Sequence, residues 1–256
     1  GTIDAVDIFA RGGSADDGAV GGTVTVTALG AVVITGIVST DGGDGAAADG
    51  GAAGTVEVRS TGSTITVNNV NANGGHGAGG GGANNGGNGG LIILDNSAGA
   101  GDITLNGLLS AIGGTGTAAG AEGKVVLLTA GAIVDNDSVD ALDVLAGSLQ
   151  IQAPTGIAGS TGSNARLEIE VTSLAASTTT GNVVVLDDDS FAGTRLDGLT
   201  ITTITTVVQL IPVATVGVSV TGDAGGRIDV EAVGPMTVEQ QVNNAGDAAT
   251  STIQLS

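Results

Sequence analysis

The segment Gly54-Thr-Val-Glu-Val-Arg-Ser60 combines a leading glycine with strictly alternating apolar and polar residues. Alternation at a period of two is typical of a β-strand with one buried face. The pattern recurs in Gly22-Thr-Val-Thr-Val-Thr-Ala28, Gly90-Leu-Ile-Ile-Leu-Asp95, Gly123-Lys-Val-Val-Leu-Leu-Thr129 and Gly226-Arg-Ile-Asp-Val-Glu-Ala232. The first four leading glycines follow one another at 32, 36 and 33 residues, so we infer an internal repeat.

Each repeat continues with a glycine corner and a second apolar run, as in residues 29–38 and 61–70. A low-complexity loop follows in Asp41–Gly54, Asn73–Gly90 and Gly113–Gly123. Short strands joined by glycine corners are expected to form one turn of a solenoid, because glycine adopts positive φ without a Cβ penalty. Stacked turns bury ladders of Val, Ile and Leu. The sequence therefore predicts an all-β fold, a parallel β-helix (β-solenoid) with Gly-rich loops projecting from one corner.

The repeat is regular over residues 1–130 and changes from Gly131 onward. Strand-like blocks continue beyond that point, but they are more closely spaced and their joints are rich in Ser and Thr, as in Leu199–Ile204 and Val207–Ile211. We interpret residues 131–256 as a continued, less regular β-solenoid that stacks on a neighbouring unit. A separate β-sandwich is the alternative.

Composition limits both the core and the partners. The chain has 48 Gly and 41% hydrophobic residues but no Trp, Tyr or Cys, so its core must consist of small branched side chains. The net charge is −20, from 26 acidic and six basic residues. Nucleic-acid binding is not expected, because it requires basic clusters that neutralise phosphates. Membrane insertion is not expected either, because no apolar run approaches about 18 residues.

The segments Gly22–Asp41, Gly54–Asn73 and Gly101–Thr129 resemble repeats of filamentous-haemagglutinin-like bacterial exoproteins, which alternate Gly-x-Val-x-Val-x-Ala with a Gly-rich joint. Residues 132–176 are also similar to repeats of giant secreted β-strand-rich surface proteins. The resemblance implies a right-handed β-helix, export to the bacterial cell surface, and roles in adhesion, filaments or biofilm matrix. Host or matrix glycans are then candidate partners.

Clusters of aspartate are the candidate metal ligands, because carboxylate oxygens suit Ca²⁺. The candidates are Asp41, Asp44, Asp49, Asp135, Asp137, Asp140, Asp187, Asp188 and Asp189. Each cluster departs from a known loop motif: residues 42–47 have Ala where a calcium β-roll requires Asp, and residues 135–140 lack the Gly and distal Glu of an EF-hand. Calcium binding and simple solvated charge both stay open, and no cofactor is required.

No residue pattern indicates catalysis. His76, the only histidine, lies in a run of glycines that offers it no fixed partner, so we expect a solvated loop residue. A polysaccharide lyase or hydrolase is the enzyme alternative, but such sites use aromatic platforms and, for acidic sugars, basic residues. The chain lacks Trp and Tyr and has a single Lys. We therefore predict a protein that is not an enzyme.

Both termini match the interior of the repeat. Residues 251–256 followed by residues 1–11 resemble the continuous segment 101–111, and neither end carries an evident cap. Uncapped solenoid ends expose strand edges that template further pairing. We expect a structural or adhesive module of an extracellular fibre that associates head to tail with itself or continues as a covalent tandem array. The alternative is a passive stalk segment of a giant adhesin.

Overall fold

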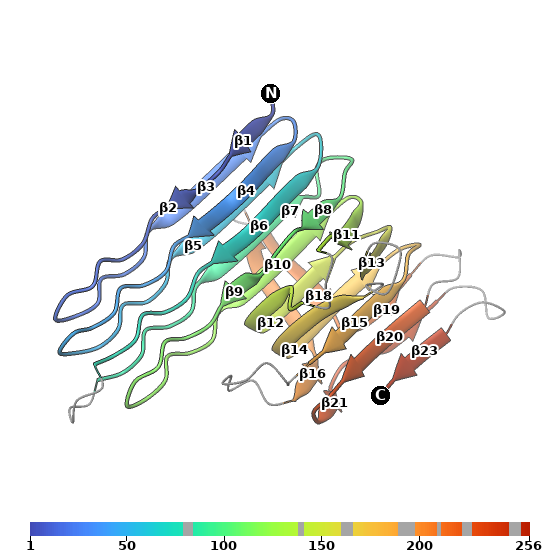
Figure 1. Ribbon diagram of the computed structural model, residues 1–256. Coiled ribbons are helices and arrows are strands. Elements are labelled where there is room, and N and C mark those ends of the chain that lie inside the picture. Colours follow the sequence, from blue (N-terminus) through green and yellow to red (C-terminus); the bar gives the residue numbers. More distant parts are fainter. Residues whose placement is uncertain are drawn as a thin grey trace.

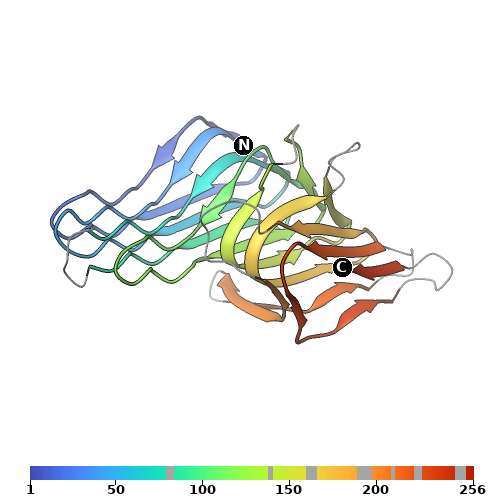
Figure 2. The ribbon, with the colours of Figure 1, turned by 60° about the horizontal axis from the view of Figure 1, so that its bottom comes forward.

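The computed structural model describes residues 1–78, 84–137, 141–159, 166–188, 198–208, 211–221, 227–245 and 252–256. The regular secondary structure in these residues is entirely β-strand. Figures 1 and 2 show the first and the last strands at opposite ends of the molecule. The described part of the chain contains no helix with the length and apolar character that crossing a membrane requires.

The first eleven strands are β1 (Ile3–Ala5), β2 (Ile8–Phe9), β3 (Thr23–Ala28), β4 (Val32–Ser39), β5 (Thr55–Ser60), β6 (Ile65–Asn71), β7 (Leu91–Asn96), β8 (Ile103–Leu105), β9 (Leu109–Ala111), β10 (Lys124–Thr129) and β11 (Ala132–Asp135). The remaining strands are β12 (Val144–Gln152), β13 (Gly156–Gly159), β14 (Leu167–Thr178), β15 (Val183–Asp187), β16 (Leu199–Ile201), β17 (Thr203–Val208), β18 (Ile211–Val216), β19 (Val218–Val220), β20 (Arg227–Ala232), β21 (Met236–Val238), β22 (Val242–Asn244) and β23 (Thr252–Leu255).

Equivalent segments of the repeat pair in parallel, as their alignment predicts. Strand β3 pairs with β5, β5 with β7, β7 with β10 and β10 with β12. One apolar ladder in this register is Val24, Val56, Ile92, Val125, Leu149, Leu174, Ile201 and Val238. A second ladder on other strands is Ile3, Val32, Ile65, Ile103, Ile133, Ile157, Val183, Ile228 and Ile253.

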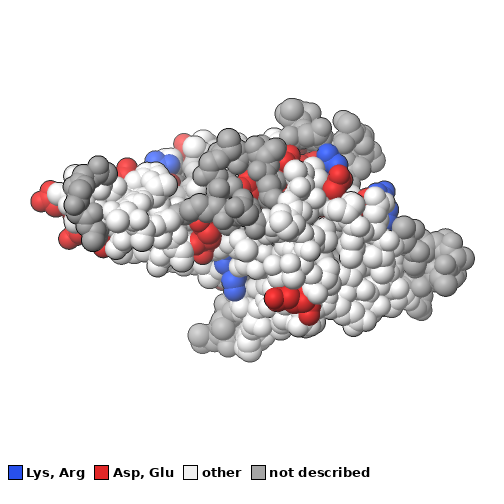
Figure 3. All heavy atoms as spheres, turned by 90° about the horizontal axis from the view of Figure 1, so that it is seen from below, with Lys and Arg blue, Asp and Glu red and all other residues white. Residues whose placement is uncertain are grey.

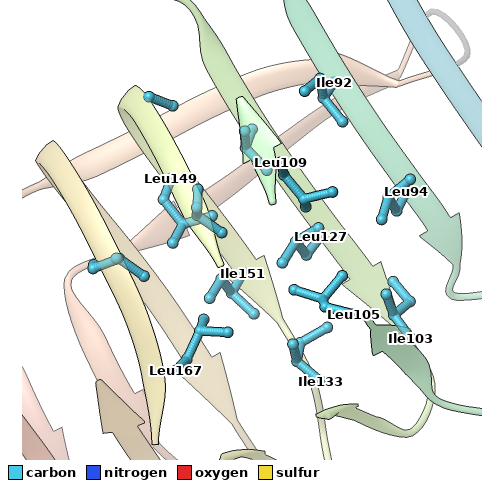
Figure 4. Close-up of a cluster of buried hydrophobic side chains, with 14 of the residues drawn as sticks. Ile92, Leu94, Ile103, Leu105, Leu109, Leu127, Ile133, Leu149, Ile151 and Leu167 are labelled. Atoms are coloured by element: carbon cyan, nitrogen blue, oxygen red, sulfur yellow. The ribbon is translucent and has the colours of Figure 1, made fainter. Parts of the chain in front are cut away.

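These ladders form the main core. In β3 the exposure alternates residue by residue, and Val24 and Val26 are buried while the threonines between them are exposed. Figure 4 shows the same arrangement in the middle of the molecule, where Leu94, Leu127 and Ile151 lie against side chains from β8, β9 and β11. β-Branched and aliphatic residues pack well on a pleated surface, so the part of the core that the structure describes forms without aromatic side chains.

The prediction of a β-solenoid is wrong. Eight strands form a closed parallel β-barrel, and thirteen strands of the same 21-stranded sheet pack outside it. Parallel pairings run from β6 through β8, β11, β13, β15, β14, β12 and β9 back to β6.

The sheet closes where a single strand takes part in two ladders. Strand β6 pairs with β8 through residues 65–67 and with β9 through residues 70–71, so one strand belongs to two ladders. Strand β12 likewise pairs with both β9 and β10. The repeat predicted separate faces divided by corners, whereas these strands continue from one ladder into the next and join the faces into one closed sheet.

The Gly-rich loops extend from the same side of the molecule (Figure 1) and hydrogen bond to one another through their backbones. Their outgoing and returning limbs alternate in a continuous series of N–H···O bonds of 2.8–2.9 Å. The series is Gly43 to Ala19, Gly51 to Gly43, Gly75 to Gly51, Gly87 to Gly75, Gly114 to Gly87 and Gly120 to Gly114, donor first. The described parts of these low-complexity segments are therefore packed backbone against backbone.

Of the blocks Leu199–Ile204 and Val207–Ile211, residues 199–201 continue the parallel sheet as β16. Strands β17 and β18 instead form an antiparallel hairpin, where further turns of the repeat were expected. The hairpin lies across the outside of the sheet, where Val208 and Val213 pack against Ile93, Val126 and Leu128. These outward-facing residues of β7 and β10 are apolar because the hairpin covers them. The pairing of β10 with β12 continues the main sheet across position 130.

Candidate functional site

The first group of predicted metal ligands, Asp41, Asp44 and Asp49, forms hydrogen bonds with neighbouring loops. Asp41 Oδ1 accepts a hydrogen bond from the backbone N–H of Asn73 at 2.8 Å. Asp44 Oδ1 accepts one from His76 at 2.8 Å, and Asp49 Oδ1 accepts one from Asn85 at 2.6 Å. Each carboxylate thus fastens its loop to the next one along the sheet. The structure does not bring these three aspartates together in a cluster of the kind that holds an ion.

His76 has a similar role in the next loop. Its side chain is exposed, and its Nδ1 accepts a hydrogen bond from the backbone N–H of Thr115 at 3.1 Å. The Thr115 hydroxyl lies 2.8 Å from the same nitrogen. The expected exposure is confirmed, but the ring is held by a partner in the following loop.

The third predicted group is divided. Asp187, the last residue of β15, is buried and its Oδ1 accepts a hydrogen bond from the backbone N–H of Val171 at 3.1 Å. Asp188 donates its backbone N–H to the carbonyl of Ile169 at 2.9 Å. Asp189 lies outside the described residues, so its place as a ligand stays a prediction.

The second predicted group contains the strongest candidate. Carboxylate oxygens of Asp135, Asp137 and Asp143 all lie within 4.8 Å of one another. Asp135 ends β11 and Asp143 immediately precedes β12, so the cluster joins the end of one strand to the start of the next. Asp140 lies outside the described residues.

Asp135 occupies a position that the core otherwise gives to apolar residues. Its register partner in β8 is Leu105, which in turn aligns with Val67 and Ile34. Asp135 is 1% exposed, so its carboxyl group is shielded from solvent at the edge of the core. Burial of a carboxylate is costly unless hydrogen bonds or a counter-charge compensate. An acid at this ladder position is a signal that aligning the repeats would have revealed.

Asp143 was missed by the sequence analysis because it belongs to no recognisable loop motif. It is fully buried, and its Oδ2 accepts a hydrogen bond from the backbone N–H of Glu168 at 3.0 Å. Its Oδ1 is buried without a hydrogen-bond partner. Burial, followed by the nearby Asp135 carboxylate, raises the pKa of Asp143 to about 9.

The charges in this cluster repel one another. Two like charges about 4 Å apart repel by about 4 kcal/mol at an effective dielectric constant of about 20. The side chain of Glu168 is 2% exposed and adds another carboxyl group beside Asp143. Arg166 Nε lies 3.2 Å from Glu168 Oε1 and partly balances that group. The aspartate cluster therefore favours either a shared proton or a bound cation.

A second feature is a cleft of about 520 Å³ beside the β17–β18 hairpin, lined by Glu122, Lys124 and Thr206 among other residues. Lys124 Nζ donates hydrogen bonds to the Thr205 carbonyl at 3.1 Å and to the Thr206 hydroxyl at 3.3 Å. Burial lowers the pKa of Lys124. Through these bonds Lys124, the first residue of β10, anchors the hairpin to the sheet.

The third feature is the pair of sheet ends. Among the described residues, β1, β2 and β3 each pair on one side only, and so do β21, β22 and β23. The described residues include nine large hydrophobic side chains that are exposed, and eight of them lie near these ends: Val6, Phe9, Val20 and Leu29 near the first, and Val233, Val238, Ile253 and Leu255 near the other. The ninth is Val216 in the hairpin.

Charged side chains also lie at both ends, where Asp4 and Asp7 are exposed near the first strands and Glu231 near the last. Figure 3 shows acidic side chains scattered over one face, with basic side chains at a few places. The ion pairs on the described surface include Arg227 with Asp229 and Arg166 with Glu231. A surface this acidic favours solubility and leaves the apolar ends as the places where association is favourable.

Comparison with protein-family models, with curated protein sequences and with solved structures found no match to this chain.

Proposed function

We propose that this chain is a structural module that associates end to end with further copies of itself in an extracellular fibre or matrix. The observation that carries the proposal is that the described edge strands at both ends of the sheet pair on one side only, and that two apolar ladders are exposed at the last strands. Val238 and Ile253 are the last described members of two ladders and are 48% and 47% exposed. Interior members of the same ladders, such as Ile92 and Ile65, are fully buried.

A second copy is the partner that fits these ends. The ladder that ends at Ile253 begins at Ile3, and the ladder that ends at Val238 begins at Val24. A second copy could stack its β1 on β23 and its β3 on β21. Both ladders would then continue with the apolar residue types that they already contain. It would also satisfy the unpaired backbone groups of both edges, about 4.8 Å from the strands they meet.

The setting and the adhesive role are part of the proposal. They are supported by the resemblance of the repeats to filamentous-haemagglutinin-like exoproteins. Further turns of a longer chain would satisfy the same open ends, as in a stalk segment of a giant adhesin. Association of the isolated chain distinguishes the two functions.

The test uses light scattering after size exclusion together with electron microscopy of the purified chain. We expect particle mass to rise with concentration and filaments to form. Ile253→Lys places a charge in the open ladder and should leave single particles. Val216→Lys changes an equally exposed apolar residue away from the ends, and should associate like the unmodified chain. Short isolated rods at every concentration would contradict self-association and favour the stalk.

A further inference from the structure

The aspartate cluster has the geometry of a cation site. Oxygens from Asp135, Asp137 and Asp143 lie no more than 4.8 Å apart, which is about twice the 2.3–2.6 Å bond that Ca²⁺ forms with oxygen. Asp135 and Asp143 are buried and Asp137 is half-buried, so an ion there would be reached from one side. The backbone N–H of Asp137 donates to Asp135 Oδ1 at 3.0 Å and holds these two residues in a tight turn.

An independent feature points to a ligand. Asp143 is fully buried, and one of its carboxylate oxygens lies within 4.8 Å of oxygens from Asp135 and Asp137. Its Oδ2 accepts a hydrogen bond from the backbone N–H of Glu168, whereas its Oδ1 is buried without a hydrogen-bond partner. A buried acceptor oxygen left without a donor is destabilising unless something satisfies it. A cation would satisfy this oxygen and reduce the repulsion among the three carboxylates at the same time.

We propose that Asp135, Asp137 and Asp143 bind one Ca²⁺ ion that joins the end of β11 to the start of β12. Three carboxylates supply the hard oxygen ligands that Ca²⁺ prefers, and water can complete its coordination from the half-buried side. Mg²⁺ fits less well because it requires near-ideal octahedral geometry and keeps most of its water. The site lies within one chain, so it is independent of the proposed end-to-end association.

The test is calorimetric titration of chelator-treated protein with CaCl₂, in the Ile253→Lys background so that association does not contribute heat. We expect one site per chain that Asp143→Asn weakens at least about tenfold, because the number of charged ligands sets calcium affinity. Asp17→Asn removes an exposed aspartate at the first loop and is the matched control, which should bind as before.

Thermal unfolding separates loss of the ion from loss of the fold. In chelator, Asp143→Asn should unfold at about the same temperature as its parent, because the amide oxygen can still accept the Glu168 N–H. Calcium should raise the melting temperature of the parent but not of Asp143→Asn. Circular dichroism is the appropriate probe, since the chain lacks Trp and Tyr. Absence of binding, or equal binding by Asp143→Asn, would overturn the proposal.

Discussion

A methyl group on Gly75 should test whether the Gly-rich loops are packed as tightly as the hydrogen bonds indicate. A Cβ at this residue would lie 2.0 Å from the carbonyl oxygen of Gly43 and 2.5 Å from its carbonyl carbon. Both atoms belong to the backbone of the preceding loop and cannot rotate away. Gly75→Ala therefore requires the two loops to separate.

The cost follows from what separation breaks. Gly75 donates to Gly51 and Gly45 donates to His76, both at 2.8 Å between the two loops, and each lost backbone bond costs about 0.5–1.5 kcal/mol. Overpacking adds about 1–3 kcal/mol. Reduced entropy of the unfolded chain offsets about 0.4–1 kcal/mol. We expect a net loss of about 1–6 kcal/mol in the free energy of unfolding.

The matched control is Gly13→Ala in the first loop. A Cβ at Gly13 meets nothing within 4 Å, and this glycine has no positive φ, so the substitution should be neutral or slightly stabilising. Urea unfolding followed by circular dichroism measures the stability of both variants. The melting temperature should fall by about 2–4 °C for each kcal/mol of unfolding free energy that is lost. Equal stability of Gly75→Ala and Gly13→Ala would refute close packing of the loops.

Two further substitutions test contacts outside the loops. Asp95→Leu should lower the free energy of unfolding by about 3–5 kcal/mol, because it leaves the buried guanidinium of Arg59 without the carboxylate 2.8 Å away. Asp95→Leu combined with Arg59→Met should recover most of this loss in the same urea titration. A double variant as unstable as the single one would show that lost packing, not an unpaired charge, causes the effect. Gln150→Leu should speed hydrogen exchange in β17 and β18, because the buried Gln150 accepts a hydrogen bond from Thr206 and donates to the hairpin. Gln152→Leu, at a less buried position, should have the smaller effect, and the opposite ranking would contradict this role of Gln150.

The sequence predicted the strands and their register well because these depend on local pattern. Alternation in residues 22–28 and 54–60 identifies which side chains face inward, and the paired register of Val24 with Val56 matches the alignment of the two segments. It could not predict how the ladders join. At the end of β6, Val70 and Asn71 pair with a different strand from the one that Ile65 pairs with. This change of partner depends on the path of the chain through space, and it closes the barrel.

The candidate site was predicted only in part. Asp135 and Asp137 were chosen for their acidity, but Asp143 becomes their neighbour only because β12 returns to pair beside β9 and β14. The other chosen aspartates, such as Asp41 and Asp44, use their oxygens on backbone N–H groups of the next loop. Acidic composition alone does not distinguish these two uses.

The sequence by itself determined that the chain is all-β, that its equivalent segments pair in parallel, and that its core consists of Val, Ile, Leu and Ala. Those properties follow from residue type and from a period of two, which are both local. Only the tertiary structure decided that the sheet closes, that residues 203–208 and 211–216 pair as antiparallel strands over Ile93 and Val126, and that the glycine loops pack together. Each of these depends on which distant segment covers a given face, and a local pattern shows that a face is buried without showing what buries it.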